Sequence, residues 1–125
     1  MLSRDVILSV DDRKIERVAV PEWGGDVCVR VMSGAERDSF ESQMLARKGG
    51  ADVSIRAPLA AVTLCDEAGR RLFTPADVEA LGEKSGTALD RVFNAAIRIN
   101  AMGKADVEAL EKNSGSAPSG ASGSN

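Results

Sequence analysis

The sequence contains no histidine and no tyrosine, and its 125 residues include only one tryptophan, three phenylalanines and two cysteines. The absence of histidine removes the commonest general base of enzymes and the commonest protein ligand of metal ions. Two cysteines without histidine make a poor zinc site, so we expect neither a metal nor a cofactor. No recognisable nucleophile–base pair and no glycine-rich phosphate loop occurs, and the chain is therefore predicted not to be an enzyme.

Long apolar runs and an excess of positive charge are missing as well. No stretch of about 18 apolar residues occurs, so no transmembrane helix is expected, and the charged N-terminal segment does not resemble a secretory signal. Sixteen basic and nineteen acidic residues give a net charge of −3, which argues against nucleic-acid binding. We interpret the protein as cytosolic, with Cys28 and Cys65 as small buried residues; a disulfide between them is not predicted by the sequence.

The N-terminal part has the pattern of a β-hairpin. Ser3 is a suitable cap for a short helical turn, and residues 14–20 favour a strand. Residues 21–25, with two glycines, form a turn, and residues 26–32 alternate between two faces, with Val27 and Val29 on one of them.

The rest of the chain is typical of helices. Ser33 and Glu36 form a capping box that begins a helix over 34–47, which Gly49 and Gly50 should end. Thr74, Pro75 and Asp77 begin a short helix that ends near Gly82–Gly86. Thr87 is expected to cap a helix over 88–101, and a last short helix covers 104–112. The predicted fold class is therefore α+β: an N-terminal hairpin followed by a mainly helical C-terminal half.

Residues 57–65 are ambiguous. Pro58 suits the first turn of a helix, whereas the apolar run 60–65 also suits a strand that returns after a turn at 66–69. Short apolar runs do not discriminate between these alternatives, and the sequence leaves both open.

The hexapeptide ADVEAL occurs twice, at 76–81 and at 105–110. Two copies are too few for a solenoid, so we interpret them as two short helices that bracket the long helix between them and pack on it. Val78, Leu81, Val107 and Leu110 are the expected contacts. Residues 114–125 contain only Ser, Gly, Ala, Pro and Asn, and a flexible tail is expected after a single domain over 1–113.

Six apolar residues are the candidates for contact with a partner. Trp23 lies in the hairpin turn, where it is either an anchor on the core or an exposed binding residue. The others stand on predicted helices and serve either the core or an interface. The full set is Trp23, Phe40, Met44, Phe93, Ile97 and Leu110.

The order of several short motifs resembles the tail assembly chaperone family of long-tailed bacteriophages and prophages. The resemblance covers roughly residues 1–113. Its motifs are VPEWGG (20–25) before the VCVRVM strand, SGAERDSF (33–40), CDEAGRRLFT (65–74), DVEAL (77–81), LDRVF (89–93) and IN (99–100).

The resemblance implies a non-enzymatic role. Proteins of this family bind the tape measure protein, a long helical chain that sets tail length, and keep it soluble while the tail tube polymerises around it. It further implies a longer form, made by a translational frameshift, that recruits the major tail protein. The implied location is the host cytoplasm and not the mature virion, and self-association along the client is expected. Alternative interpretations are a tail-completion or connector protein retained in the virion, or a small bacterial adaptor domain.

Overall fold

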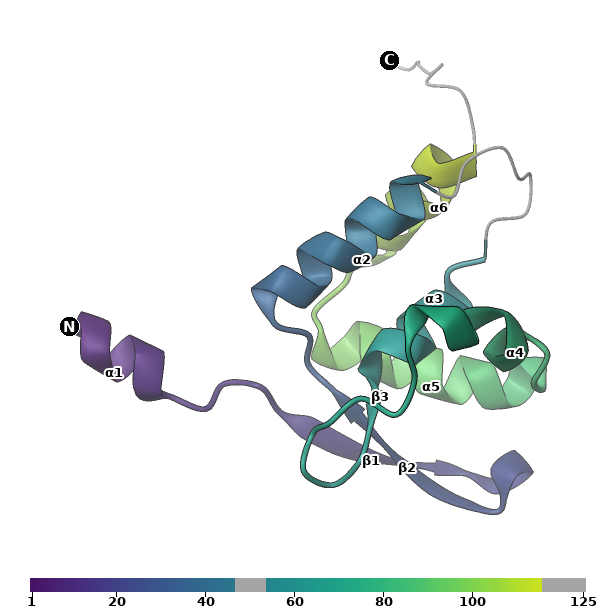
Figure 1. Cartoon of the computed structure of the whole chain (residues 1–125), viewed down its shortest axis with the longest axis horizontal. Helices are drawn as coiled ribbons and strands as arrows, with labels where there is room; N and C mark the ends of the chain where they lie inside the picture. Colours follow the sequence, from purple (N-terminus) through teal and green to yellow (C-terminus); the bar gives the residue numbers. More distant parts are fainter. Residues whose placement is uncertain (47–53, 116–125) are drawn as a thin grey trace.

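The computed structural model describes residues 1–46 and 54–115. The expected helix end at Gly49 and Gly50, and the expected tail after Gly115, lie outside the described residues. The helical elements are α1 (Arg4–Ser9), η1 (Pro21–Trp23), α2 (Gly34–Ala46), α3 (Arg56–Thr63), η2 (Pro75–Asp77), α4 (Val78–Gly82), α5 (Gly86–Ile99) and α6 (Lys104–Gly115). The strands are β1 (Ile15–Val20), β2 (Gly25–Arg30) and β3 (Leu64–Cys65). The predicted α+β class and its N-terminal hairpin are confirmed (Figure 1).

The sheet is antiparallel with the order β1-β2-β3. Strands β1 and β2 form the hairpin, in which Val18 lies opposite Val27. The turn between them is the η1 segment followed by Gly24, whose φ of 81° lies in the left-handed region that glycine adopts without strain. The sequence PEWGG therefore fixes the turn, and the turn fixes the register of the pair.

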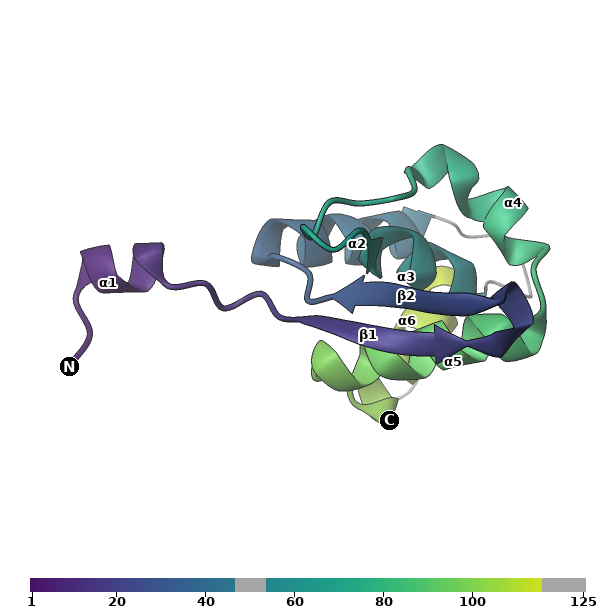
Figure 2. The ribbon, with the colours of Figure 1, turned by 90° about the horizontal axis from the view of Figure 1, so that it is seen from below.

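Helix α5 lies between the sheet and α3 and forms the centre of the core (Figures 1 and 2). Its apolar stripe is buried, and the side chains in it are Ala88, Leu89, Val92, Ala95 and Ala96. On the strand side, Val20 and Val29 are fully buried. Two short hydrogen bonds from Arg98 to Glu16, of 2.7 and 2.6 Å, join the end of α5 to β1 at the exposed edge of this contact.

Residues 57–65 combine both alternatives that the sequence left open. The segment begins as helix α3, with Pro58 as its third residue, where a missing backbone N–H leaves no hydrogen bond unmade. It then continues directly into β3, where Cys65 pairs with Cys28 of β2. Asp66 accepts backbone hydrogen bonds from Ala68 and Arg70, and this turn returns the chain beside Cys65. The helix therefore ends where the chain becomes the third strand.

The two ADVEAL copies form helices, but the expected packing of both on α5 is wrong. The first copy, in η2 and α4, packs mainly on α3, and the second, in α6, packs mainly on α2. The reason is that α3 and the sheet already cover α5. Helix α6 extends to Gly115, three residues beyond its expected end.

Helix α5 begins two residues earlier than the predicted cap indicates. The side chain of Ser85 accepts a hydrogen bond of 3.2 Å from the Ala88 amide, so Ser85 and not Thr87 is the N-cap. The helix ends at Ile99, because Asn100 leaves the helical conformation and Ala101 has a φ of 54°.

Asn100 is a buried polar residue that ties the end of α5 to the segment between β2 and α2. Its carbonyl oxygen accepts a hydrogen bond of 2.8 Å from the Met32 amide. Its amide nitrogen donates to the backbone oxygens of Ala96, at 2.9 Å, and Arg30, at 3.4 Å. One side chain thus satisfies backbone groups of two elements that are distant in sequence.

Replacing Asn100 with Ala should lower the free energy of unfolding by about 2–3 kcal/mol, because the buried Met32 amide loses its partner. Urea denaturation measures the change. The exposed Asn94 on the same helix provides the control, and Asn94→Ala should change stability by less than about 0.5 kcal/mol. Equal effects of the two substitutions would show that the hydrogen bond to Met32 contributes nothing.

Candidate partner-binding groove

The capping box predicted at the start of α2 is confirmed. The Ser33 hydroxyl accepts a hydrogen bond of 3.1 Å from the Glu36 amide, and the Glu36 carboxylate accepts one of 2.9 Å from the Ser33 amide. The box fixes the direction in which α2 leaves the sheet. Phe40 and Met44, one helical turn apart, then both point from α2 into the core.

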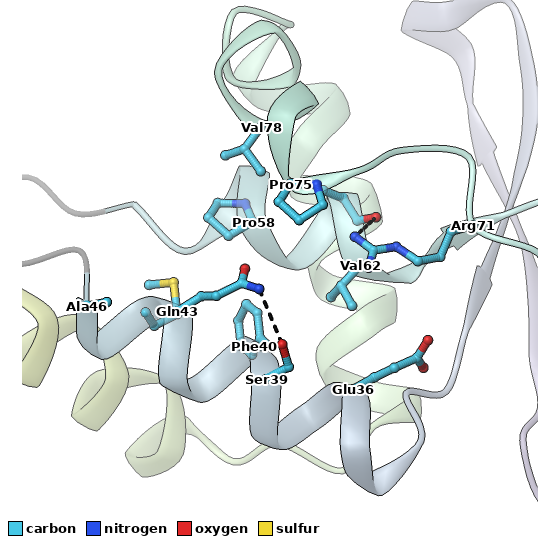
Figure 3. A pocket seen from close by; sticks show the side chains of 12 residues that line it. Glu36, Ser39, Phe40, Gln43, Ala46, Pro58, Val62, Arg71, Pro75 and Val78 are labelled. Carbon is cyan, nitrogen blue, oxygen red and sulfur yellow. Dashed lines mark hydrogen bonds between the residues drawn. The ribbon is translucent and has the colours of Figure 1, made fainter.

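A groove of about 370 Å³ runs between α2 and the opposite wall of α3, η2 and α4 (Figure 3). Phe40 and Met44 form its base and are 4% and 0% exposed. The remaining lining residues are Glu36, Ser39, Gln43, Ala46, Pro58, Ala61, Val62, Arg71, Pro75 and Val78. Most of them are apolar, so the groove is a hydrophobic surface with polar groups at its rim on both walls.

The polar groups along the groove are held in place by neighbours. Gln43 donates a hydrogen bond of 3.3 Å to the Ser39 hydroxyl on α2. On the other wall, Arg71 donates one of 3.3 Å to the backbone oxygen of Ala61. Figure 3 shows these side chains around the opening. The arrangement suits an apolar segment that is flanked by polar residues, such as one face of an amphipathic helix.

Behind one end of the groove lies a buried arginine. The guanidinium of Arg30 donates two hydrogen bonds, of 3.2 and 3.0 Å, to the backbone oxygen of Val62. It also donates to the Glu36 carboxylate at 2.6 Å and to the backbone oxygen of Gly69 at 3.4 Å. The second carboxylate oxygen of Glu36 accepts a bond of 3.1 Å from Arg13. Both walls of the groove are therefore attached to one cation.

This network sets the ionisation of Glu36. Partial burial by itself raises the pKa of the carboxyl group, but the Ser33 amide, Arg30 and Arg13 together outweigh burial, so the pKa lies below its ordinary value of 4.5. Glu36 therefore remains ionised at neutral pH and balances the buried charge of Arg30.

The six residues predicted to contact a partner do not form one surface. Phe40 and Met44 lie at the base of the groove. Phe93 and Ile97 lie half-buried against the core on α5, and Leu110 does the same on α6. The sequence did not indicate the opposite wall, because Pro58, Val62 and Val78 approach α2 only in the folded chain.

Trp23 belongs to a second apolar depression, of about 500 Å³, at the hairpin turn. The side chain is half-buried and packs against the core, which favours the anchor interpretation, yet part of it lines this depression. Phe73, Ala80 and Leu81 are the other apolar lining residues, and Asp77 and Lys84 supply charge. We call this the Trp23 pocket.

Within residues 1–46 and 54–115, no cluster of three or more potential metal ligands occurs. No helix in these ranges is long and apolar enough to cross a membrane. Cys28 and Cys65 are both free thiols that face each other across β2 and β3. Burial raises the pKa of the Cys65 thiol, as expected for a packed residue in the core.

The chain folds as a small α+β domain with an apolar groove on its surface. The family model for phage tail assembly chaperones matches residues 4–113, and the chain belongs to this family. Its fold is similar to that of the tail assembly chaperone of bacteriophage HK97, with a TM-score of 0.54 and 21% identity over 73% of this chain and 85% of that one. A search of curated proteins found no match.

Replacing Glu36 with Gln should lower the free energy of unfolding by about 2 kcal/mol at pH 7, because Arg30 then lacks its counter-charge. The pKa of Glu36 is depressed by folding, so its contribution is fully present above its unfolded pKa, near 4.5, and is lost as the pH falls through the lower folded value. Urea denaturation of the wild type and the variant at pH 7 and at pH 3 measures this. The difference in their free energies of unfolding should shrink to below about 1 kcal/mol near pH 3.

The control is Glu41→Gln, which removes a partly exposed i,i+4 pair with Arg37 on the same helix. Its cost should be about 0.3–0.5 kcal/mol at pH 7. A Glu36→Gln deficit that stays constant down to pH 3 would contradict the electrostatic role of this carboxylate.

Proposed function

We propose that this chain binds the tape measure protein of its phage and keeps it soluble while the tail tube polymerises. The groove between α2 and α3 is the observation that carries the proposal, because its apolar base and polar rim fit one face of an amphipathic helix. Membership of the tail assembly chaperone family supports the same role. The protein then acts by binding and performs no catalysis.

A single groove of this size covers only a short part of a long helical client. Several copies bound side by side along one client gain avidity from weak individual contacts. The proposal therefore includes self-association. It also includes a longer, frameshifted form that recruits the major tail protein, a location in the host cytoplasm and absence from the finished virion.

Co-expression with the tape measure protein of the same phage tests the role. The client should appear in the soluble fraction with this chain and in the insoluble fraction without it, and the two should co-purify. Ser39→Arg places a long charged side chain at the groove from an exposed position, and the soluble client should fall about tenfold.

The matched control is Ser42→Arg, an exposed position on the same helix outside the groove lining. This variant should retain the client. Failure of the wild-type chain to solubilise or co-purify with the client would overturn the proposal. Detection of the chain in purified virions would favour a tail-completion or connector protein instead.

A further inference from the structure

Exposed hydrophobic side chains are concentrated at the N-terminus. Among the described residues, most of the large hydrophobic side chains that are exposed lie in the first ten positions. They are Met1, Leu2, Val6, Ile7, Leu8 and Val10, with exposed fractions of 46% or more. We call residues 1–10 the N-terminal arm.

The N-terminal arm projects from one end of the domain and makes no packing contact with it (Figures 1 and 2). Its helix α1 has only six residues and an N-cap at Ser3, whose hydroxyl accepts from the Val6 amide at 3.3 Å. A helix this short is not stable alone in water. The arm therefore needs a partner surface from outside its own domain.

The Trp23 pocket lies at the opposite end of the long axis, where the hairpin turn and α4 are found (Figures 1 and 2). Its apolar lining suits the arm's aliphatic side chains. Its charged residues are Asp77, which accepts hydrogen bonds from Thr74, and Lys84. The arm carries Arg4 and Asp5, an exposed pair 3.1 Å apart that docking would exchange for contacts with these two residues. Polarity and charge are therefore complementary between the two ends of one chain.

We propose that the N-terminal arm of one copy docks in the Trp23 pocket of the next copy. A contact between two different surfaces at opposite ends is heterologous, so repetition adds copies in one direction and makes an open array rather than a closed dimer. The inference deepens the proposed self-association and rests on it. The groove between α2 and α3 is not part of this contact and remains open for the client.

Sedimentation velocity of the purified full chain, without client, is the first test. The expected result is a series of species that grows beyond the dimer as concentration rises. Ile7→Glu with Leu8→Glu in the arm, or Ala80→Glu in the pocket, should each leave a monomer and weaken association about 100-fold, because a carboxylate would be buried among apolar groups. All three positions are exposed in the isolated chain, so thermal melts should remain cooperative.

The control is Asn94→Glu, which adds the same charge at an exposed position of α5 outside the pocket and should assemble as wild type does. Mixing the arm variant with the Ala80→Glu variant provides a sharper test. Each supplies the surface that the other lacks, so the mixture should form a one-to-one heterodimer and nothing larger. A mixture that stays monomeric overturns the inference.

Exchanging the charges of Lys84 and Asp5 tests whether these two residues meet when the arm lies in the Trp23 pocket. Lys84→Asp should weaken association, and adding Asp5→Lys in the same chain should restore it. A monomeric wild-type chain, or assembly that persists in both the arm and the pocket variants, overturns the arm contact. The solubility of the tape measure protein is read separately, so a chain that fails to assemble and still holds its client retains the proposed function.

Discussion

The buried guanidinium of Arg30 is the interaction on which the arrangement of the groove depends. The residue is 5% exposed, and such a cation is tolerated in a protein interior only when hydrogen bonds and a counter-charge surround it. Its partners come from three separate places: the end of α3 at Val62, the loop at Gly69 and the start of α2 at Glu36. Because one side chain satisfies all three, α2 cannot shift relative to α3 without leaving a buried charge unpaired.

This constraint bears on binding. A groove whose walls are fixed before the partner arrives loses little conformational entropy when it is filled. The N-terminal arm has the opposite property, since its apolar side chains are exposed and its helix has no support from its own domain. The domain therefore contains a preformed concave surface and an extension that gains stability only by contact with another surface.

Local signals predicted the parts of this structure that are fixed by neighbours in sequence. The capping box of Ser33 and Glu36 and the PEWGG turn both formed as expected, since each is closed within five residues. Residues 57–65 remained ambiguous because an apolar run fits a helix and a strand equally, and the chain uses both in succession. Thr87 is a residue type that commonly caps helices, but it is the Ser85 hydroxyl that accepts a hydrogen bond from the Ala88 amide at the start of α5.

Contacts between segments that are distant in sequence could not be predicted from such local signals. The alternation of residues 26–32 placed Arg30 on the other face of the strand from Val29. Nothing near Arg30 in the sequence indicates that the backbone oxygens of Val62 and Gly69 accept its hydrogen bonds. The second wall of the groove was missed for the same reason, because its residues lie opposite α2 only through contacts between segments that are distant in sequence.

The two ADVEAL copies show why identical local sequence does not determine a binding surface. Both become short helices, yet one packs on α3 and the other on α2. The first copy contributes Val78 to the groove, and it also contributes Asp77, Ala80 and Leu81 to the Trp23 pocket. One short helix thus separates the proposed client groove from the proposed arm pocket. Because the two surfaces share no lining residue, filling one does not require emptying the other, and copies joined through their arms can each present an open groove to the same client.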